Sequence, residues 1–177
     1  ARIADAGLEV FMENLRVGKK EYEIGSEVFR EIYGKGVEEI YGFWVRSGPK
    51  NTEYHGIPSF TKRGVRDGDL VWIDMGMSRD GYFADTARST IAGRVAENRR
   101  RLCDVCLTAL ESAFRAMRPG VRVSEVFEAS IRRARETGFE KYFKIGFWGH
   151  GVGVNMDEYP VFAPNEPTIL QPNMVLS

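Results

Sequence analysis

The chain has 177 residues with 25 basic and 25 acidic side chains, so its formal net charge is zero. This balance gives no electrostatic reason to expect a nucleic acid or an anionic membrane as partner. A chain of this length can bury one hydrophobic core, and no apolar run approaches the roughly 20 residues that span a bilayer. Two cysteines cannot form a disulfide framework, so a reducing, cytoplasmic setting is expected.

The first half of the chain predicts two helices followed by strands. Apolar residues at helical spacing predict an amphipathic helix over residues 1 to about 16 and a second helix that ends near Gly34. Residues 42–47 predict a strand, and residues 48–53 have the composition of a loop. The segment Asp69–Ile91 then has the pattern of a β-hairpin, which we take as the centre of the fold.

Two aspartates are expected to meet in this hairpin. If residues 78–81 form the loop, the ladder pairs Met77 with Tyr82 and Asp74 with Asp85. Carboxylates directly opposite one another lie about 5 Å apart at Cβ and repel. A divalent cation between them would remove the repulsion, because carboxylate oxygens are hard ligands. The alternative is that Asp74 caps a turn, or that the register differs and the two side chains never meet.

The second half of the chain predicts the same order of helix, helix and strand. A long helix is expected over about residues 96–117, with Leu102, Cys106, Ala109, Leu110, Ala113 and Met117 on one face. A fourth helix is expected to begin at Ser124 as its N-cap and to end near Gly138. A strand is then predicted over residues 142–148, followed by a glycine-rich segment at 149–154.

Short sequences recur between the two halves in the same order. The matching segments are Arg16-Val17-Gly18 with Glu23 and Arg118-Pro119-Gly120 with Glu125, and then Gly42-Phe43-Trp44 and Gly146-Phe147-Trp148. This echo predicts a pseudo-two-fold α+β domain, with two helix-helix-strand halves over one curved sheet. A site between such halves would take ligands from both, and one histidine follows each Gly-Phe-Trp: His55 and His150.

Each histidine has a functional and a structural interpretation. His150, in Gly-His-Gly, is a candidate imidazole ligand beside the two aspartates, or a hydrogen-bonded histidine in a tight turn. His55 could polarise or position a substrate group, or it could be a loop histidine without a role. Cys103 and Cys106 form a C-x-x-C pattern inside a helix and have no second cysteine pair, so core packing is predicted for them.

Taken together, these motifs resemble the pita-bread metallohydrolases, which include methionine aminopeptidase, prolidase, aminopeptidase P and the metal-free creatinase. The segments that carry the resemblance are residues 47–49, 54–58, 68–69, 73–76, 81–82, 85–88 and 149–153. The resemblance implies the pita-bread fold, an α+β fold with pseudo-two-fold halves over a curved antiparallel sheet. It implies that residues 1–177 are one catalytic domain without the N-terminal domain of the prolidase type.

The resemblance also implies a metal centre. Asp74, Asp85 and His150 would be three of the five protein ligands of two divalent metal ions (Mn, Co, Fe or Zn). The remaining two ligands of the family are glutamates from strands that follow a segment like residues 172–175. The chain is therefore expected to be a fragment that is incomplete at its C-terminus.

The substrate side of the site is expected to depart from the peptidases. His55 resembles the histidine that contacts the scissile amide. Asp157 stands where the peptidases have a second histidine that stabilises the tetrahedral intermediate, and a carboxylate there is a negative group where an electrophilic group is wanted.

The predicted function is a metal-dependent hydrolase, a Xaa-Pro peptidase on the prolidase or aminopeptidase P side, that cleaves a short peptide or small amide. It is expected to be a cytoplasmic homodimer. One alternative is a non-peptidase enzyme of the same fold (a creatinase-like or ectoine-hydrolase-like amidohydrolase, or a lyase) in which Asp157 binds a cationic group. Another is a catalytically silent scaffold.

Overall fold

The structure is a computed structural model that describes residues 1–49, 58–143 and 146–177. These residues form two compact units, the first of residues 1–95 with 153–156 and the second of residues 96–152 with 157–177. His55 and most of the loop expected over residues 48–53 lie outside the described residues. Within the described part of the chain, no helix combines the length and the apolar character that crossing a bilayer requires.

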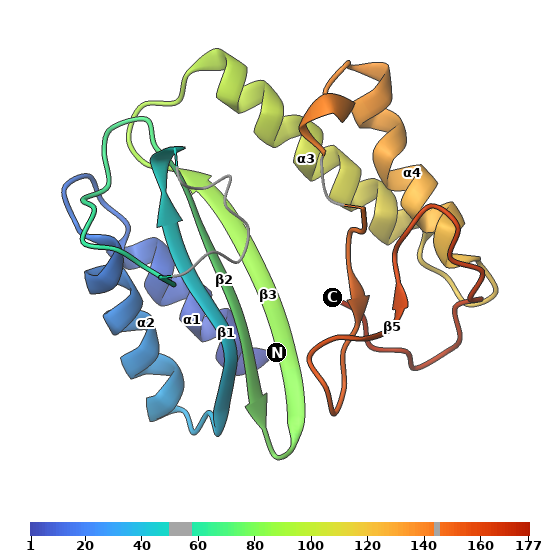
Figure 1. Cartoon of the computed structure of the whole chain (residues 1–177), viewed down its shortest axis with the longest axis horizontal. Coiled ribbons are helices and arrows are strands. Elements are labelled where there is room, and N and C mark those ends of the chain that lie inside the picture. The colour runs from blue at the N-terminus through green and yellow to red at the C-terminus, as the bar shows by residue number, and fades with distance from the viewer. Residues whose placement is uncertain (50–57, 144–145) are drawn as a thin grey trace. The chain divides into compact units, whose positions relative to one another are not determined.

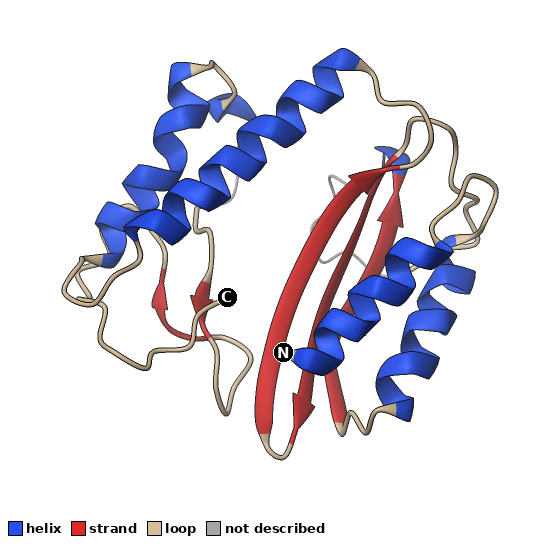
Figure 2. Cartoon of the chain, turned by 180° about the vertical axis from the view of Figure 1, so that it is seen from behind, coloured by secondary structure: helices blue, strands red, loops and turns tan. Residues whose placement is uncertain are grey.

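The first unit is a three-stranded antiparallel sheet with two helices on one face (Figures 1 and 2). Its elements are α1 (Arg2–Asn14), α2 (Glu21–Gly34), β1 (Glu39–Ser47), β2 (Leu70–Arg79) and β3 (Tyr82–Ile91). The strands lie in the order β1-β2-β3. Both helices and the hairpin predicted from the sequence are confirmed, and β1 begins three residues earlier than expected.

The core of this unit follows from two periodicities. Alternate residues of β2 point to one face of the sheet, and helical residues three or four apart share one side of a helix. The buried members of these two sets are Val71, Ile73, Met75 and Met77 on β2, and Ala4, Phe11, Ile24, Val28 and Ile32 on the helices. Together they form one apolar cluster between the sheet and the helices.

The predicted register of the central hairpin is wrong. Asp80 and Gly81 both have positive φ, 54° and 74°, so the loop has two residues instead of four. An Asp-Gly loop of this kind matches the right-handed twist of the flanking strands, which a longer loop need not do. The observed pairs are Arg79–Tyr82, Met77–Ala84, Gly76–Asp85 and Asp74–Ala87. Asp74 and Asp85 are therefore not directly opposite one another.

The second unit packs two helices over a small antiparallel pair of strands. Its elements are α3 (Glu97–Ala116), α4 (Val123–Glu136), the 3₁₀ turn η2 (Glu140–Tyr142), β4 (His150–Gly151) and β5 (Glu158–Val161). Residues of α3 and α4 bury one another: Val105 packs with Phe127, Ile131 and Ala134.

Three expectations for this unit are wrong. No strand forms in the described part of residues 142–148, where Tyr142 ends the η2 turn. Ser124 lies inside α4, whose N-cap is Arg122 without a side-chain hydrogen bond. Cys106 is exposed and is not a core residue. In each of these three cases the local sequence pattern predicted a feature that the folded chain does not have.

The segments that recur in the sequence also make corresponding backbone hydrogen bonds. In the first unit, the residues just before and at the start of α2 pair with residues 63–65; in the second unit, the residues just before and at the start of α4 pair with residues 168–170. The corresponding bonds are Gly18 N to Val65 O and Gly120 N to Leu170 O, Val65 N to Lys19 O and Leu170 N to Val121 O, and Glu21 N to Arg63 O and Val123 N to Thr168 O. The two halves thus share their helix-helix-strand order and the way in which each second helix is anchored.

Candidate metal and substrate site

Asp74 and Asp85 lie on the face of the first unit's sheet that is turned away from α1 and α2. Asp74 alternates with the buried Ile73 and Met75, so its side chain points to the opposite face. Asp85 pairs directly with Gly76, which is two residues from Asp74 and shares its face. The register therefore keeps both carboxylates on one face, although it does not place them opposite each other.

The two aspartates are diagonal neighbours on adjacent strands. Asp74 pairs with Ala87, two residues beyond Asp85, and such diagonal positions are about 7–8 Å apart or somewhat less at Cβ. The argument from repulsion between directly opposed carboxylates therefore fails. The hypothesis of a shared cation is retained, because two carboxylates at this spacing can both extend toward a cation between them.

Gly76 leaves room between these aspartates for another segment of the first unit. A Cβ added at Gly76 would overlap the sulfur of Met156, so a side chain at this position on β2 would displace the end of that methionine. The backbone N–H of Phe83 on β3 donates to Gly153 O at 2.7 Å. Residues 153–156 are thus fastened to the same hairpin that carries Asp74 and Asp85.

His150 in the second unit is held by strand pairing on both sides. It pairs with Val161 of β5, and its N–H and C=O exchange hydrogen bonds of 2.9 and 2.8 Å with Ser177. Its Nδ1 lies 2.9 Å from Gly151 O. Because a carbonyl oxygen can only accept, Nδ1 carries the proton of that bond, and Nε2 is the nitrogen through which a neutral ring would bind a ligand. The backbone therefore fixes both the position and the tautomer of the ring.

Asp157 lies beside this ring. Its Oδ1 is 3.1 Å from His150 Nε2, and its side chain is 59% exposed while that of His150 is 11% exposed. Asp157 directly precedes β5, whose pairing with β4 brings these two residues together. Nothing in the sequence predicted this contact, because the two residues are joined by a loop whose course the sequence pattern does not determine.

The predicted residues therefore fall into two local groups. The first unit brings Asp74 and Asp85 to one sheet face, and the second unit brings His150 and Asp157 into contact. Neither unit by itself gathers three His, Cys, Asp or Glu side chains that could hold a metal among its described residues. The three-residue metal set stays a prediction, and His55 lies outside the described residues.

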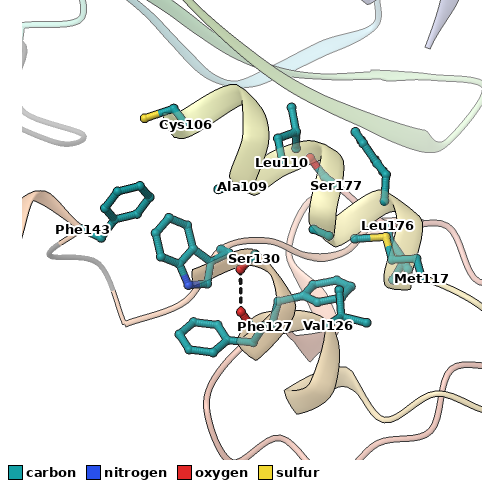
Figure 3. Close-up of a pocket in the computed structure, with 14 residues that line it drawn as sticks. Cys106, Ala109, Leu110, Met117, Val126, Phe127, Ser130, Phe143, Leu176 and Ser177 are labelled. Atoms are coloured by element: carbon teal, nitrogen blue, oxygen red, sulfur yellow. Dashed lines mark hydrogen bonds between the residues drawn. The ribbon is translucent and has the colours of Figure 1, made fainter. Parts of the chain in front are cut away.

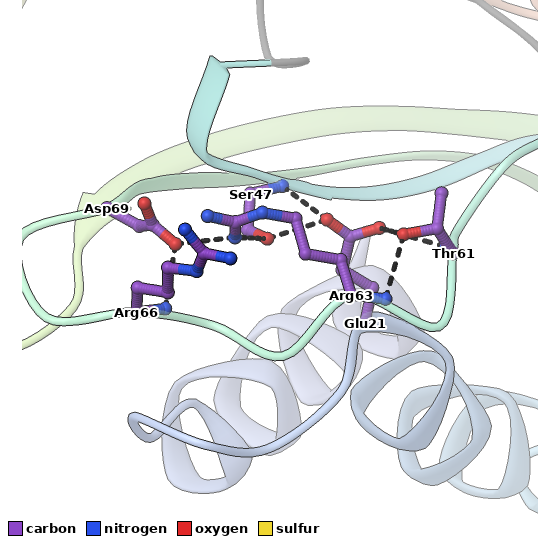
Figure 4. Close-up of polar contacts among 6 residues, drawn as sticks. All are labelled: Glu21, Ser47, Thr61, Arg63, Arg66 and Asp69. Atoms are coloured by element: carbon purple, nitrogen blue, oxygen red, sulfur yellow. Dashed lines mark hydrogen bonds and ion pairs between the residues drawn. The ribbon is translucent and has the colours of Figure 1, made fainter.

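A buried carboxylate in the first unit was missed at the sequence level. Glu21, which is 1% exposed, accepts four hydrogen bonds at the start of α2 (Figure 4). Its Oε1 accepts from the N–H and hydroxyl of Ser47 at 2.9 and 2.6 Å, and its Oε2 from those of Thr61 at 2.9 and 2.7 Å. Ser47 ends β1, so this single side chain ties the end of β1 to the segment at Thr61.

The network continues to a second acid. Arg63 Nη1 bonds Ser47 Oγ at 2.6 Å and Asp69 Oδ2 at 2.5 Å, and Arg66 N donates to Asp69 Oδ2 at 2.7 Å. Burial raises the pKa of Asp69, but these hydrogen bonds and the charges of Arg63 and Arg66 outweigh burial, so the pKa lies below its ordinary value. Asp69 is thus held as a carboxylate at the turn into β2.

A sequence signal for Glu21 did exist. Glu21 lies three residues before Ile24 and seven before Val28, so it occupies the buried stripe of α2. A carboxylate on an apolar stripe needs several hydrogen-bond donors, and the Ser and Thr that supply them here are 26 and 40 residues away.

The second unit also contains an apolar pocket of about 190 Å³, lined by side chains of α3 and α4 and by Trp148, Phe162 and Leu176 (Figure 3). Its one hydroxyl in the helices, Ser130, is already bonded to Phe127 O at 2.6 Å. Cys106 lines the pocket; although its side chain reaches solvent, desolvation by the apolar groups packed around it, with Cys103 nearby, raises the pKa of its thiol. A thiol that resists ionisation is a poor nucleophile, so Cys106 is not a candidate for nucleophilic catalysis.

Comparison with known proteins agrees with the fold and with the motifs. The model of metallopeptidase family M24 matches residues 1–177. The Xaa-Pro dipeptidase of Pyrococcus furiosus is 31% identical over 176 residues, which is 99% of this chain and 50% of that protein. The putative dipeptidase YkvY of Bacillus subtilis is 30% identical over 176 residues, 99% of this chain and 48% of that protein.

A solved structure of a relative agrees with this family match. The prolidase from Pyrococcus furiosus superposes with a TM-score of 0.92 at 28% identity, covering 99% of this chain and 51% of that chain. The pita-bread fold predicted from the sequence is confirmed. The chain spans about half the length of the relatives that it matches.

Proposed function

Because the chain belongs to metallopeptidase family M24, we propose that the protein containing it is a metal-dependent Xaa-Pro peptidase. One observation carries the proposal: in a chain that matches the family model over its whole length, Asp74 and Asp85 share one face of adjacent strands, turned away from the helices. The names of the relatives, Xaa-Pro dipeptidase and prolidase, support the substrate class. A cytoplasmic location and a homodimer stay predictions from the sequence.

The donor chemistry of the described residues fits a centre of two divalent ions. Asp74 and Asp85 offer carboxylate oxygens, and His150 offers Nε2 because its Nδ1–H is engaged by Gly151 O. Such a mixture of oxygen donors and one imidazole suits Mn, Co, Fe or Zn. When bound, the metal ions would lower the pKa of a water molecule toward neutrality and polarise the scissile carbonyl.

The chain's own residues have separate tasks in this proposal. Asp74 and Asp85 would hold the ions from the sheet face, and the hydrogen bond to the Gly151 carbonyl orients the His150 ring with Nε2 facing Asp157. His55 would hydrogen-bond the substrate amide, as the family resemblance implies. Asp157 places a negative charge next to His150.

The proposal is tested with an Xaa-Pro dipeptide and the protein at its full natural length. We expect hydrolysis that a chelator abolishes and that added Mn²⁺ or Co²⁺ restores. Asp85→Asn should lower the rate at least about 100-fold, since a carboxylate ligand is lost. Asp80→Asn, in the exposed turn of the same hairpin, is the matched control and should leave the rate unchanged.

The same assay distinguishes the proposed peptidase from a second candidate function, the hydrolysis of a small cationic substrate. Asp157, a carboxylate beside His150, favours a small cationic amide or amidine as substrate over a neutral dipeptide. Hydrolysis of such compounds together with inert Xaa-Pro dipeptides would replace the peptidase proposal with the small-molecule one. A protein that binds no metal and turns over neither class would overturn both.

A further inference from the structure

The contact between His150 and Asp157 has an unusual electrostatic character. Because Nδ1 donates its proton to Gly151 O, the Nε2 of a neutral ring presents a lone pair. The atom that faces it, Asp157 Oδ1 at 3.1 Å, is also an acceptor. Two acceptors at this distance require a positive species between them: a proton on Nε2 or a cation bound to both.

The spacing matches two ligands of one metal ion. Imidazole nitrogen and carboxylate oxygen bind Zn²⁺ at about 2.0–2.2 Å. Two donors at that radius and 3.1 Å apart subtend about 95° at the ion, between the octahedral and the tetrahedral values. The distance is thus compatible with a shared ion, as it is with an ordinary N–H···O hydrogen bond.

The scaffold that sets this distance is well defined. β4 has hydrogen-bonded neighbours on both sides, β5 on one and residues 175–177 on the other. Asp157 is attached to the start of β5, where Gly151 pairs with Glu158. The separation between the two donors is thus a property of paired strands, which hold a ligand geometry better than a free loop does.

We propose that Asp157 and His150 bind the same divalent metal ion, Asp157 through Oδ1 and His150 through Nε2. This assignment rests on the proposed role of His150 as a metal ligand and adds a ligand that the family resemblance does not supply. The additional carboxylate brings a negative charge and a hard oxygen donor to the ion. The proposed site should therefore favour oxygen-preferring ions such as Mn²⁺ more than a site with a histidine at this position would.

The test is a calorimetric titration of the protein at its full natural length with Mn²⁺ and Zn²⁺. We expect Asp157→Asn to weaken Mn²⁺ binding about 10-fold or more, because it removes a charged donor from the ion. Asp157→Glu keeps the carboxylate and should retain part of the affinity. Asp104→Asn, an exposed aspartate on α3 of the same unit, is the matched control and should bind Mn²⁺ as the unaltered chain does. Circular dichroism of each variant verifies that it is folded.

A second measurement separates ligation from an ion pair. The chain has only two histidines, so long-range ¹H–¹⁵N spectra with and without Zn²⁺, assigned with His150→Asn, report the state of this ring. We expect Nδ1 to stay protonated while the Nε2 signal moves on addition of Zn²⁺. An Nε2 that keeps a proton at saturating Zn²⁺ would overturn the assignment.

The outcomes distinguish this inference from the proposed function. If Asp157→Asn binds Mn²⁺ as tightly as the unaltered chain while Asp85→Asn does not, the shared-ligand inference fails and the proposed metal centre stands. If the unaltered protein at its full natural length shows no saturable binding of either ion, the inference and the metal part of the proposed function both fail. A loss of binding in Asp157→Asn that Asp104→Asn does not share supports the inference.

Discussion

At the scale of single residues, Glu21 illustrates how one buried charge can organise a region. Its four hydrogen bonds come from the backbone and hydroxyl groups of two residues, one at the end of β1 and one at position 61. Two of these donors are backbone N–H groups, which cannot turn to become acceptors. The carboxylate is therefore the only common side-chain group of this size that satisfies all four.

We predict that Glu21→Gln lowers the free energy of unfolding by about 2–4 kcal/mol, measured by urea denaturation. The glutamine amide would direct N–H groups at a backbone N–H, which leaves buried donors without acceptors. Glu23→Gln on the same helix is the control. Glutamine can still accept the 2.9 Å hydrogen bond from Lys20 N, so the loss there should be much smaller. Equal losses in the two variants would contradict the assigned role of Glu21.

Asp69 leads to a prediction about pH. Its pKa is lowered in the folded chain from the ordinary value of 3.8, because the hydrogen bonds and charges of Arg63 and Arg66 outweigh its burial. A depressed pKa contributes stability that is present above pH 3.8 and is lost as the pH falls toward the folded-state value. The unfolding free energy of Asp69→Asn should thus fall less steeply below that pH than that of the unaltered chain. Parallel curves for Asp69→Asn and the unaltered chain would contradict the prediction.

At the scale of elements, the central hairpin depends on its two-residue turn. Gly81 has a φ of 74°, which an L-residue adopts at a cost of about 1–2 kcal/mol. We predict that Gly81→Ala lowers the unfolding free energy by that amount. Asp80→Asn should change it by less than about 0.5 kcal/mol, because asparagine adopts positive φ readily. If alanine were tolerated at position 81, the loop would have a different conformation and the register of Asp74 and Asp85 would have to be assigned again.

The same hairpin shows where the sequence pattern was insufficient. The apolar pattern of β2 and the β-forming residues of β3 identified both strands. The predicted hairpin boundaries agree with the structure, since β2 begins one residue after Asp69 and β3 ends at Ile91. The pattern alone left the loop length open, and each added loop residue changes which residues are paired. The turn chemistry of Asp80-Gly81 contained the missing information, since Asp-Gly is a strong signal for a two-residue loop.

At the scale of the whole molecule, α3 presents an apolar surface to solvent. Leu107 is 56% exposed, Leu110 48% and Phe114 63%, and the last two line the apolar pocket. We predict that the chain binds the dye ANS and that Leu110→Gln with Phe114→Gln reduces the fluorescence at least about twofold without lowering the unfolding free energy. Tyr41→Gln, which removes an aromatic ring that is 64% exposed on β1, is the control and should leave the fluorescence unchanged. Unaltered fluorescence in the double variant would show that the dye binds elsewhere.

The sequence by itself determined the family, the order of the elements through α4 and the internal repeat, because each rests on local periodicity or on motifs that adjoin one another in the chain. It also identified Asp74, Asp85 and His150 as candidates, although for the two aspartates by an incorrect pairing. Only the tertiary structure decided which side chains meet: Glu21 with Ser47 and Thr61, and His150 with Asp157. These contacts join residues from separate elements, and their distances depend on strand register and loop course, which no local pattern encodes.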